Sequence, residues 1–357
     1  MTSRRQFLAG LLATGLAPTP TWADAGSPQF VAAAALPDGS YVLCGIGAGD
    51  AIVFQIPLPA RGHAAAAHPT RPEAVAFARR PGTFATVIDC ASGLQKSTMT
   101  APRGRHFYGH GAFSADGDWL LTTENDFEAG QGRIGVWDVR AGYTRAGEFA
   151  SGGIGPHEIK RMGDSDIFVV ANGGIDTHPD SGRTKLNIAT MAPNLAYLHD
   201  GLVVETVALA PDMHKNSIRH LDVADGQVAF GMQWQGDGDP AVLAGLHRQG
   251  QPIVPLAASA DHMRAMRGYV GSIAFSRAGD QVAVTSPVGG VTQVFDVATN
   301  ALSHQIVAVD AGGVAARGAG FIISNGQGQL GQIAQGQLQL GARAPLAWDN
   351  HIVPVGA

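Results

Sequence analysis

The sequence has few of the residues that define several common protein classes. Only two cysteines, Cys44 and Cys90, occur in 357 residues, which excludes a disulfide-rich scaffold. Both stand inside apparent strands, where we expect buried free thiols. Charged residues make up 15% of the chain and the net charge is −5, so the chain has no general electrostatic attraction for nucleic acid. Helical periodicity is scarce, and only Asp237 to His247 favours a short helix.

Long hydrophobic runs are also missing, except near the N-terminus. Arg4 and Arg5 stand in S-R-R-Q-F-L, before an apolar run from Phe7 to Ala17 and a small-residue cleavage pattern at Ala23-Asp24-Ala25. The apolar run is too short to span a bilayer comfortably. The pattern is that of a twin-arginine export signal. We therefore expect residues 1–25 to be a signal peptide and the mature protein to lie in the periplasm, without stable membrane insertion.

Local catalytic and cofactor motifs are lacking as well. The sequence has no G-x-S-x-G elbow, no H-E-x-x-H, no P-loop and no C-x-x-C-H for covalent haem. The glycine-rich run from Asn172 to Arg183 is not followed by a helix whose N-terminus would hold a phosphate. We expect no nucleotide cofactor and favour binding over catalysis. An enzyme that acts on a small polar substrate with histidine acid and base groups stays an alternative.

Glycine, by contrast, is abundant, with 48 residues, and D-G, G-D and G-G turns separate short β-rich runs. The clearest repeat pairs H-G-A-F-S-A-D-G-D-W, from His110, with G-S-I-A-F-S-R-A-G-D, from Gly271. Each copy leads to an aromatic-Asp-Val ending, at Trp137-Asp138-Val139 and Phe295-Asp296-Val297. Copies recur about every 40 to 55 residues, a period typical of propellers and solenoids.

Seven such units can be counted, starting near residues 29, 73, 110, 157, 220, 272 and 313. We therefore predict an all-β fold, a seven-bladed β-propeller with four-stranded blades over residues 26–357. A pair of β-sandwiches is the alternative. The run from Ala347 to Val355 is expected to close the ring by pairing with the first or last blade, since closure leaves only short, protected edges.

The innermost strand of each propeller blade lines the central channel, so the starts of these strands converge even when they are far apart in sequence. The predicted starts include Glu73, His110, His157 and His220. Imidazole suits iron, copper and zinc alike, and we expect these four residues to bind a metal ion, iron first. Binding should weaken below about pH 6 as the histidines protonate. The alternative is that the histidines bind no metal and are polar caps at the ends of short strands.

Further polar residues are candidates for ligand contact: His106, Glu124, Glu158, His178, Arg183 and Arg219. Glu124 follows an apolar strand, and we expect a buried carboxylate paired with Arg133 or a histidine. His178 and Arg183 fall in a long loop of one blade. Arg219 suits bidentate contact with a carboxylate or phosphate, or a salt bridge between blades.

Several motifs resemble those of one family: R-H-F-Y-G-H-G, T-T-E-N-D, G-I-G-P-H-E, V-A-N-G-G-I-D-T-H-P, S-I-R-H-L and T-S-P-V-G-G. The chain resembles, over nearly its whole mature length, a family of twin-arginine-exported propellers of the WD40/YVTN-like kind whose function is unknown. The resemblance implies a periplasmic role in iron acquisition or handling. It also implies imelysin-like or di-haem peroxidase-like proteins as partners, with the propeller as an interaction scaffold as the alternative. It brings no catalytic residues, and Val288 stands where the family pattern has arginine.

Overall fold

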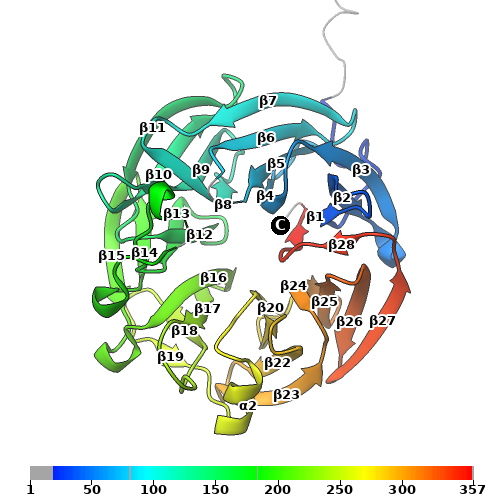
Figure 1. Ribbon diagram of the computed structural model, residues 1–357. Helices are drawn as coiled ribbons and strands as arrows, with labels where there is room; N and C mark the ends of the chain where they lie inside the picture. Colours follow the sequence, from blue (N-terminus) through cyan, green and yellow to red (C-terminus); the bar gives the residue numbers. More distant parts are fainter. Residues whose placement is uncertain (1–18, 80–81, 183, 356–357) are drawn as a thin grey trace, which may run out of the picture.

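The computed structural model describes residues 19–79, 82–182 and 184–355. These residues form seven antiparallel β-sheets, arranged radially around one axis (Figure 1). The predicted all-β fold with seven four-stranded blades is thereby confirmed, and the pair of sandwiches is excluded. Most of the expected signal peptide, residues 1–18, lies outside the described residues.

The first sheet contains β1 (Phe30–Ala35), β2 (Tyr41–Ile46), β3 (Ile52–Leu58), β28 (Ala347–Trp348) and β29 (Val353–Pro354). Each of the next three sheets contains consecutive strands: β4 (Gly62–Ala67), β5 (Glu73–Ala78), β6 (Phe84–Asp89) and β7 (Leu94–Thr100); β8 (Arg105–Phe113), β9 (Trp119–Asp126), β10 (Gln131–Asp138) and β11 (Thr144–Ala150); β12 (Pro156–Arg161), β13 (Ile167–Asn172), β14 (Asn194–His199) and β15 (Leu202–Ala208). The last three sheets follow the same rule: β16 (Asn216–Ala224), β17 (Gln227–Trp234), β18 (Ala244–Arg248) and β19 (Val254–Pro255); β20 (Ser272–Phe275), β21 (Gln281–Ser286), β22 (Val291–Asp296) and β23 (Ala301–Val307); β24 (Ala311–Arg317), β25 (Gly320–Asn325), β26 (Gln329–Ala334) and β27 (Gln337–Arg343).

The ring closes where the C-terminal segment pairs with β1. Trp348 of β28 lies opposite Ala34, and Val353 of β29 lies opposite Val31. The segment therefore supplies the innermost strand of the first sheet. This agrees with the prediction that it pairs with the first or the last blade. Trp348 is buried in a cluster that also contains Ala315 of β24, so the same segment joins the first blade to the last.

Two predicted blade starts fall on the wrong strand. The starts near residues 29 and 73 belong to β1 and β5, each the second strand of its sheet. The innermost positions are taken by the C-terminal segment and by β4. The run G-H-A-A-A-A of β4 has none of the β-branched or aromatic residues that favour strands, so the pattern does not reveal it.

The expected helix over Asp237 to His247 is also wrong. Residues 237–243 are irregular and β18 occupies the rest, because Gly238 and Pro240 interrupt any helix. A helix lies later, at α2 (Ala260–Ala265), where the Ser259 hydroxyl accepts the N–H of His262 at the N-terminus. No helix among the described residues is long and apolar enough to cross a membrane.

The repeated sequences fold into the same turn between the first and second strands of their blades. Gly117 has φ of 75° and its N–H donates to the Ser114 carbonyl oxygen at 3.0 Å. Gly279 has φ of 72° and donates to the Ser276 carbonyl oxygen at 2.9 Å. Glycine adopts this left-handed conformation without steric cost, which explains why the turn keeps it.

The aromatic-Asp-Val ending combines a buried ring with a turn. Trp137 is buried between the second and third blades, within 6.1 Å of the Phe107 ring centroid. The next residue, Asp138, accepts the N–H of Ala141 at 2.9 Å and so holds the turn into β11. Asp296 does the same for Thr299, at 2.8 Å. Each motif thus fixes both packing and chain reversal.

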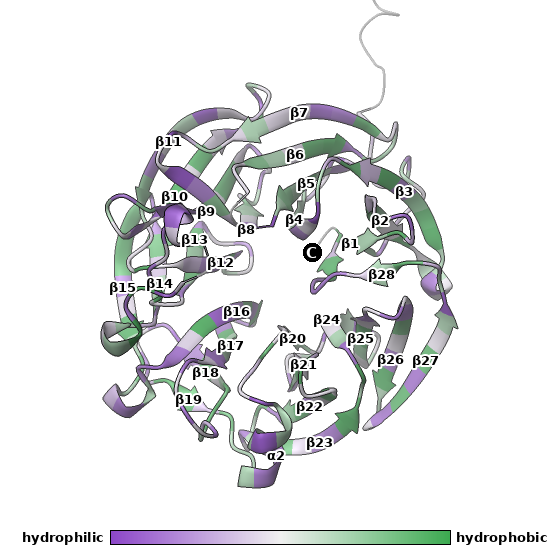
Figure 2. Ribbon diagram, viewed as in Figure 1, coloured by the Kyte–Doolittle hydropathy of each residue, from purple (hydrophilic) through white to green (hydrophobic). Residues whose placement is uncertain are grey.

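The hydrophobic core consists of such layers between neighbouring sheets. Middle strands such as β6 are mostly buried, whereas the outermost β7 and β27 are mostly exposed and carry many hydrophilic residues (Figure 2). Near the N-terminus, Trp22 packs into one of these layers and donates its Nε1–H to the His68 carbonyl oxygen at 2.9 Å. Cleavage after Ala25 would remove this contact.

Candidate metal centre

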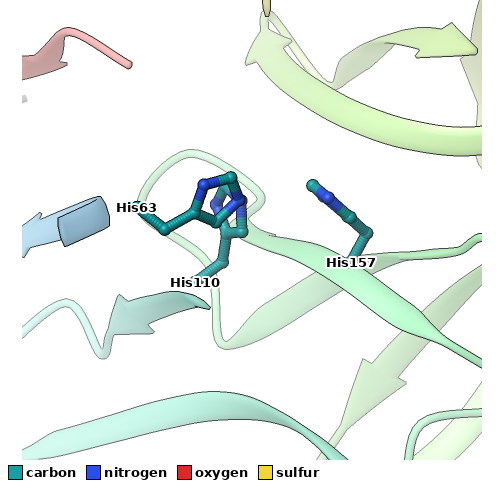
Figure 3. A group of neighbouring side chains, drawn as sticks. All are labelled: His63, His110 and His157. Carbon is teal, nitrogen blue, oxygen red and sulfur yellow. The ribbon is translucent and has the colours of Figure 1, made fainter. Parts of the chain in front are cut away.

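Five histidines meet on the propeller axis, each from a different sheet. They are His63 of β4, His110 of β8, His157 of β12, His220 of β16 and His351, which lies between β28 and β29. Ring centroids lie 4.8 Å apart for His110 and His351 and 4.9 Å apart for His157 and His220. Figure 3 shows the side chains of His63, His110 and His157 directed toward a common space.

Irregular strand pairing at these positions turns the side chains toward the axis. The register of β12 shifts between Pro156 and Glu158, at His157. That of β16 shifts between Ile218 and His220, and those of β4 and β8 also shift at their histidines. Bulges of this kind redirect a side chain and are frequent beside functional sites.

A glycine makes the closest approach possible. Gly109 precedes His110 and has φ of 103°, and a Cβ on it would lie 2.5 Å from Cδ2 of His63. Any other residue would therefore push the two histidines apart. With this space, Nε2 of His110 lies 3.3 Å from Nε2 of His63.

The ring nitrogens form two overlapping groups of three. In His63, His110 and His157, and again in His110, His220 and His351, one nitrogen of each ring lies within 4.8 Å of the others. Three buried nitrogens have no hydrogen-bond partner in the described part of the chain: Nδ1 of His63, Nδ1 of His157 and Nε2 of His351. Buried polar atoms without partners are costly, and these nitrogens could bind a metal ion.

Glu158 is the carboxylate beside these rings. Its Oε2 lies 3.3 Å from Nδ1 of His220 and accepts the N–H of Leu221 at 3.1 Å, while Oε1 lies 3.8 Å from Nδ1 of His110. Metal-binding histidines commonly donate their second N–H to such a carboxylate, which frees the other nitrogen for the ion. Burial acts to raise the pKa of Glu158, but Lys160 and His220 outweigh it and lower that pKa to about 2.

Four of the axial histidines, His63, His110, His157 and His351, are held neutral. Burial lowers the pKa of His63 to about 4, and it lowers those of His110, His157 and His351 well below the ordinary value. Neighbouring imidazoles add to the effect, since a positive charge on one disfavours a charge on the next. Neutral imidazole is the form that binds metals.

A cavity of about 450 Å³ opens on one side of these rings. The cavity lies toward the carboxyl ends of the innermost strands. Its lining includes Arg161, the last residue of β12, and Arg277, which follows β20. Polar groups at its inner end come from the histidines His110, His220 and His351, from Glu158 and from Lys160 and Asp222. A small molecule therefore has room beside an ion bound to the histidines.

The structure brings His110, His157, His220 and Glu158 together but places Glu73 elsewhere. Because Glu73 lies on β5, the second strand of its sheet, its carboxylate faces the neighbouring blade. It accepts Lys96 Nζ at 2.6 Å and the Tyr143 hydroxyl at 2.7 Å. Glu73 thus links the second and third blades and does not join the histidines.

Two other candidates have structural partners. His106 is buried, with its Nε2 3.1 Å from Nδ2 of Asn125 and its ring against Phe127. Glu124 is buried as expected, but its partner is Arg145, at 2.6 Å and 3.0 Å, and not Arg133 or a histidine. Adjacent strands β10 and β11 both offer an arginine, and the sequence does not show which one points inward.

The remaining candidates lie around the site or away from it. Arg219 precedes His220 on β16, and its charge helps to lower the pKa of His157 after burial, the largest cause. His178 lies in the long loop between β13 and β14, where Nδ1 accepts the N–H of Asp180. Arg183 lies outside the described residues. Val288 is 49% exposed in the turn between β21 and β22.

Sequence reasoning missed two of the five histidines. His63 stands in the alanine-rich β4. His351 stands in the closing segment, for which we predicted strand pairing but no ligand. Placing the closing segment innermost would have found His351. Cys44 and Cys90 are both buried free thiols, as expected, and burial raises the pKa of each to about 12.

Comparison with known proteins gives a family and a fold. The family whose model matches residues 56–355 is described as "Protein of unknown function (DUF1513)". No curated protein matches the chain. Among solved structures, a chain of Kuenenia stuttgartiensis hydrazine synthase is similar, with a TM-score of 0.60 and 12% identity over 92% of this chain and 98% of that one. At this identity the likeness concerns the fold alone.

Proposed function

This chain belongs to the DUF1513 family of proteins of unknown function, and we propose that it binds a transition-metal ion through the histidines on its axis. One observation carries the proposal. Five imidazoles from five sheets converge, and three of their buried nitrogens have no hydrogen-bond partner among the described residues. A cation bound by either group of three would contact rings that carry these nitrogens, whereas polar strand caps would leave the nitrogens unpaired.

The donor set narrows the choice of ion. Imidazole nitrogens suit iron, copper, zinc and nickel, while magnesium and calcium prefer oxygen ligands. The two buried thiols are in separate hydrophobic layers and supply no soft ligand to the site. Iron is our first choice, since the motifs resemble those of proteins linked to iron handling. The twin-arginine pattern supports a periplasmic location for this function.

Metal analysis of the purified protein tests the proposal. We expect about one ion per chain after exposure to Fe(II), Cu(II) or Zn(II), measured by elemental analysis after desalting. The triple variant His110→Ala, His157→Ala, His220→Ala should lose the ion and keep the β-sheet circular dichroism spectrum. His199→Ala is the matched control, since that side chain is 49% exposed on β14.

A folded wild-type protein that takes up none of the three metals would contradict the proposal. The scaffold for an imelysin-like or di-haem peroxidase-like partner would then be the better hypothesis. Retention of the metal by the folded triple variant would also contradict it, because the ion would then bind elsewhere.

A further inference from the structure

The histidines do not surround the axis symmetrically with respect to the cavity. His110, His220 and His351 line it, whereas His63 and His157 are not among its described lining residues. An ion bound to the histidines would therefore have imidazoles on one side and the cavity on the other. Five imidazoles leave one position of an octahedral ion unfilled, and three leave more.

A lysine stands at the inner end of the cavity. Lys160 Nζ lies 3.4 Å from Oε1 of Glu158, and the side chain is 34% exposed. Burial acts to lower the pKa of Lys160, but Glu158 and Asp222 raise it above the ordinary value, so the ammonium keeps its charge. Asp222 is itself tied to the next sheet, since its Oδ2 accepts the N–H of Phe275 at 2.7 Å. An ammonium has three N–H donors, and more than one remains for a bound molecule.

The walls of the cavity are small and apolar. Alanines from four different sheets line it and are only partly buried: Ala67, Ala112, Ala224 and Ala316. A volume of about 450 Å³ suits a small molecule. The cavity thus carries the Lys160 ammonium beside Glu158 and Asp222 at its inner end, and alanine side chains along its walls. Arg277 adds a further cation at the rim.

We propose that the cavity binds a small carboxylate with a short apolar chain, whose carboxylate occupies the open position of the metal ion and contacts Lys160. The inference rests on the proposed metal site and names the class of molecule that this site takes. An anionic head matches both the ion and Lys160. An apolar tail matches the alanine walls, where a purely inorganic anion would leave them hydrated.

Cobalt(II) provides the readout, because its visible spectrum responds to a change of ligand. Acetate and butyrate should both shift the spectrum of the cobalt-loaded protein. Butyrate should bind about tenfold tighter, since it buries two more methylene groups. The neutral isostere butyramide should have no effect.

Three variants test the two ends of the bound molecule separately. In protein loaded with cobalt, Lys160→Met should weaken the binding of both carboxylates about tenfold, and Lys160→Arg should restore most of the affinity. Ala112→Leu should weaken butyrate but not acetate, because the larger side chain fills the cavity beyond the carboxylate.

The outcomes distinguish this inference from the metal proposal. Failure to bind cobalt would overturn both. Cobalt binding with a spectrum unaffected by either carboxylate would overturn the inference alone, as would equal butyrate binding by the metal-free protein in calorimetry. Unchanged affinity in both Lys160→Met and Ala112→Leu would show that carboxylates bind elsewhere.

Discussion

At the scale of single residues, burial sets the chemistry of the axial histidines more than their neighbours do. Desolvation is the largest cause of the lowered pKa values of His63, His110, His157 and His351. The sequence supports only an ordinary histidine pKa, from which weaker binding below about pH 6 follows. The structure revises that expectation, since these rings resist protonation at mildly acidic pH.

We predict that the folded protein retains its metal at pH 5 and releases it as the pH approaches 4. A lowered pKa keeps imidazole neutral until the pH falls to the folded-state value, about 4 for His63, so protons compete for the nitrogens only there. Dialysis at pH 7, 6, 5 and 4, followed by elemental analysis, checks this. Complete release at pH 6 would indicate ligands with an ordinary pKa.

The lowered pKa values of the buried histidines should also make the metal-free protein less stable at acidic pH. Histidines in the unfolded chain protonate near their ordinary pKa, whereas the buried rings stay neutral. The free energy of unfolding of the metal-free protein should therefore decline as the pH falls from about 6.5 toward 4. Urea denaturation at several pH values measures the decline. A flat profile over this range would show that the rings protonate freely in the folded state.

At the scale of elements, the closing segment stabilises the ring more than its length suggests. Trp348 of the two-residue strand β28 is 6% exposed and packs against residues of the first and last blades. Trp348→Ala should lower the free energy of unfolding by about 3–5 kcal/mol. Leu94→Ala, on the outermost β7 with 67% of the side chain exposed, should change it by less than about 0.5 kcal/mol.

Urea denaturation followed by tryptophan fluorescence and circular dichroism compares the two variants. A loss in Trp348→Ala no larger than that in Leu94→Ala would mean that the first sheet holds without its innermost strand.

The elements also show what the sequence reveals and what it conceals. Turns with glycine and the aromatic-Asp-Val endings, such as Trp137-Asp138-Val139, have local physical causes and predict the blades well. Partners across the ring have no local signal. His63 lies in a strand that consists mostly of alanines. Glu124 pairs with Arg145 and not with Arg133, because the direction of the arginine side chains is defined only in the folded sheet.

At the scale of the whole molecule, the candidate site links five of the seven blades. An ion that binds the folded ring but not the unfolded chain stabilises the ring by mass action, by about 2.7 kcal/mol when the free ion is at 100 times its Kd. We therefore predict that saturating metal raises the Tm by about 3–6 °C. The triple histidine variant should show no rise in differential scanning calorimetry, and a rise equal to that of the wild type would place the stabilising ion elsewhere.

The fifth histidine also ties ligand exchange to the integrity of the ring. His351 stands on the segment that pairs with β1, and 288 positions along the chain separate it from His63, its neighbour on the axis. If the seam between β1 and the closing segment opens briefly, His351 leaves the axis while the other four histidines stay in place. The rate at which the ion exchanges with solution would then report how often β1 and the closing segment separate. An equilibrium measurement of folding does not detect this local opening.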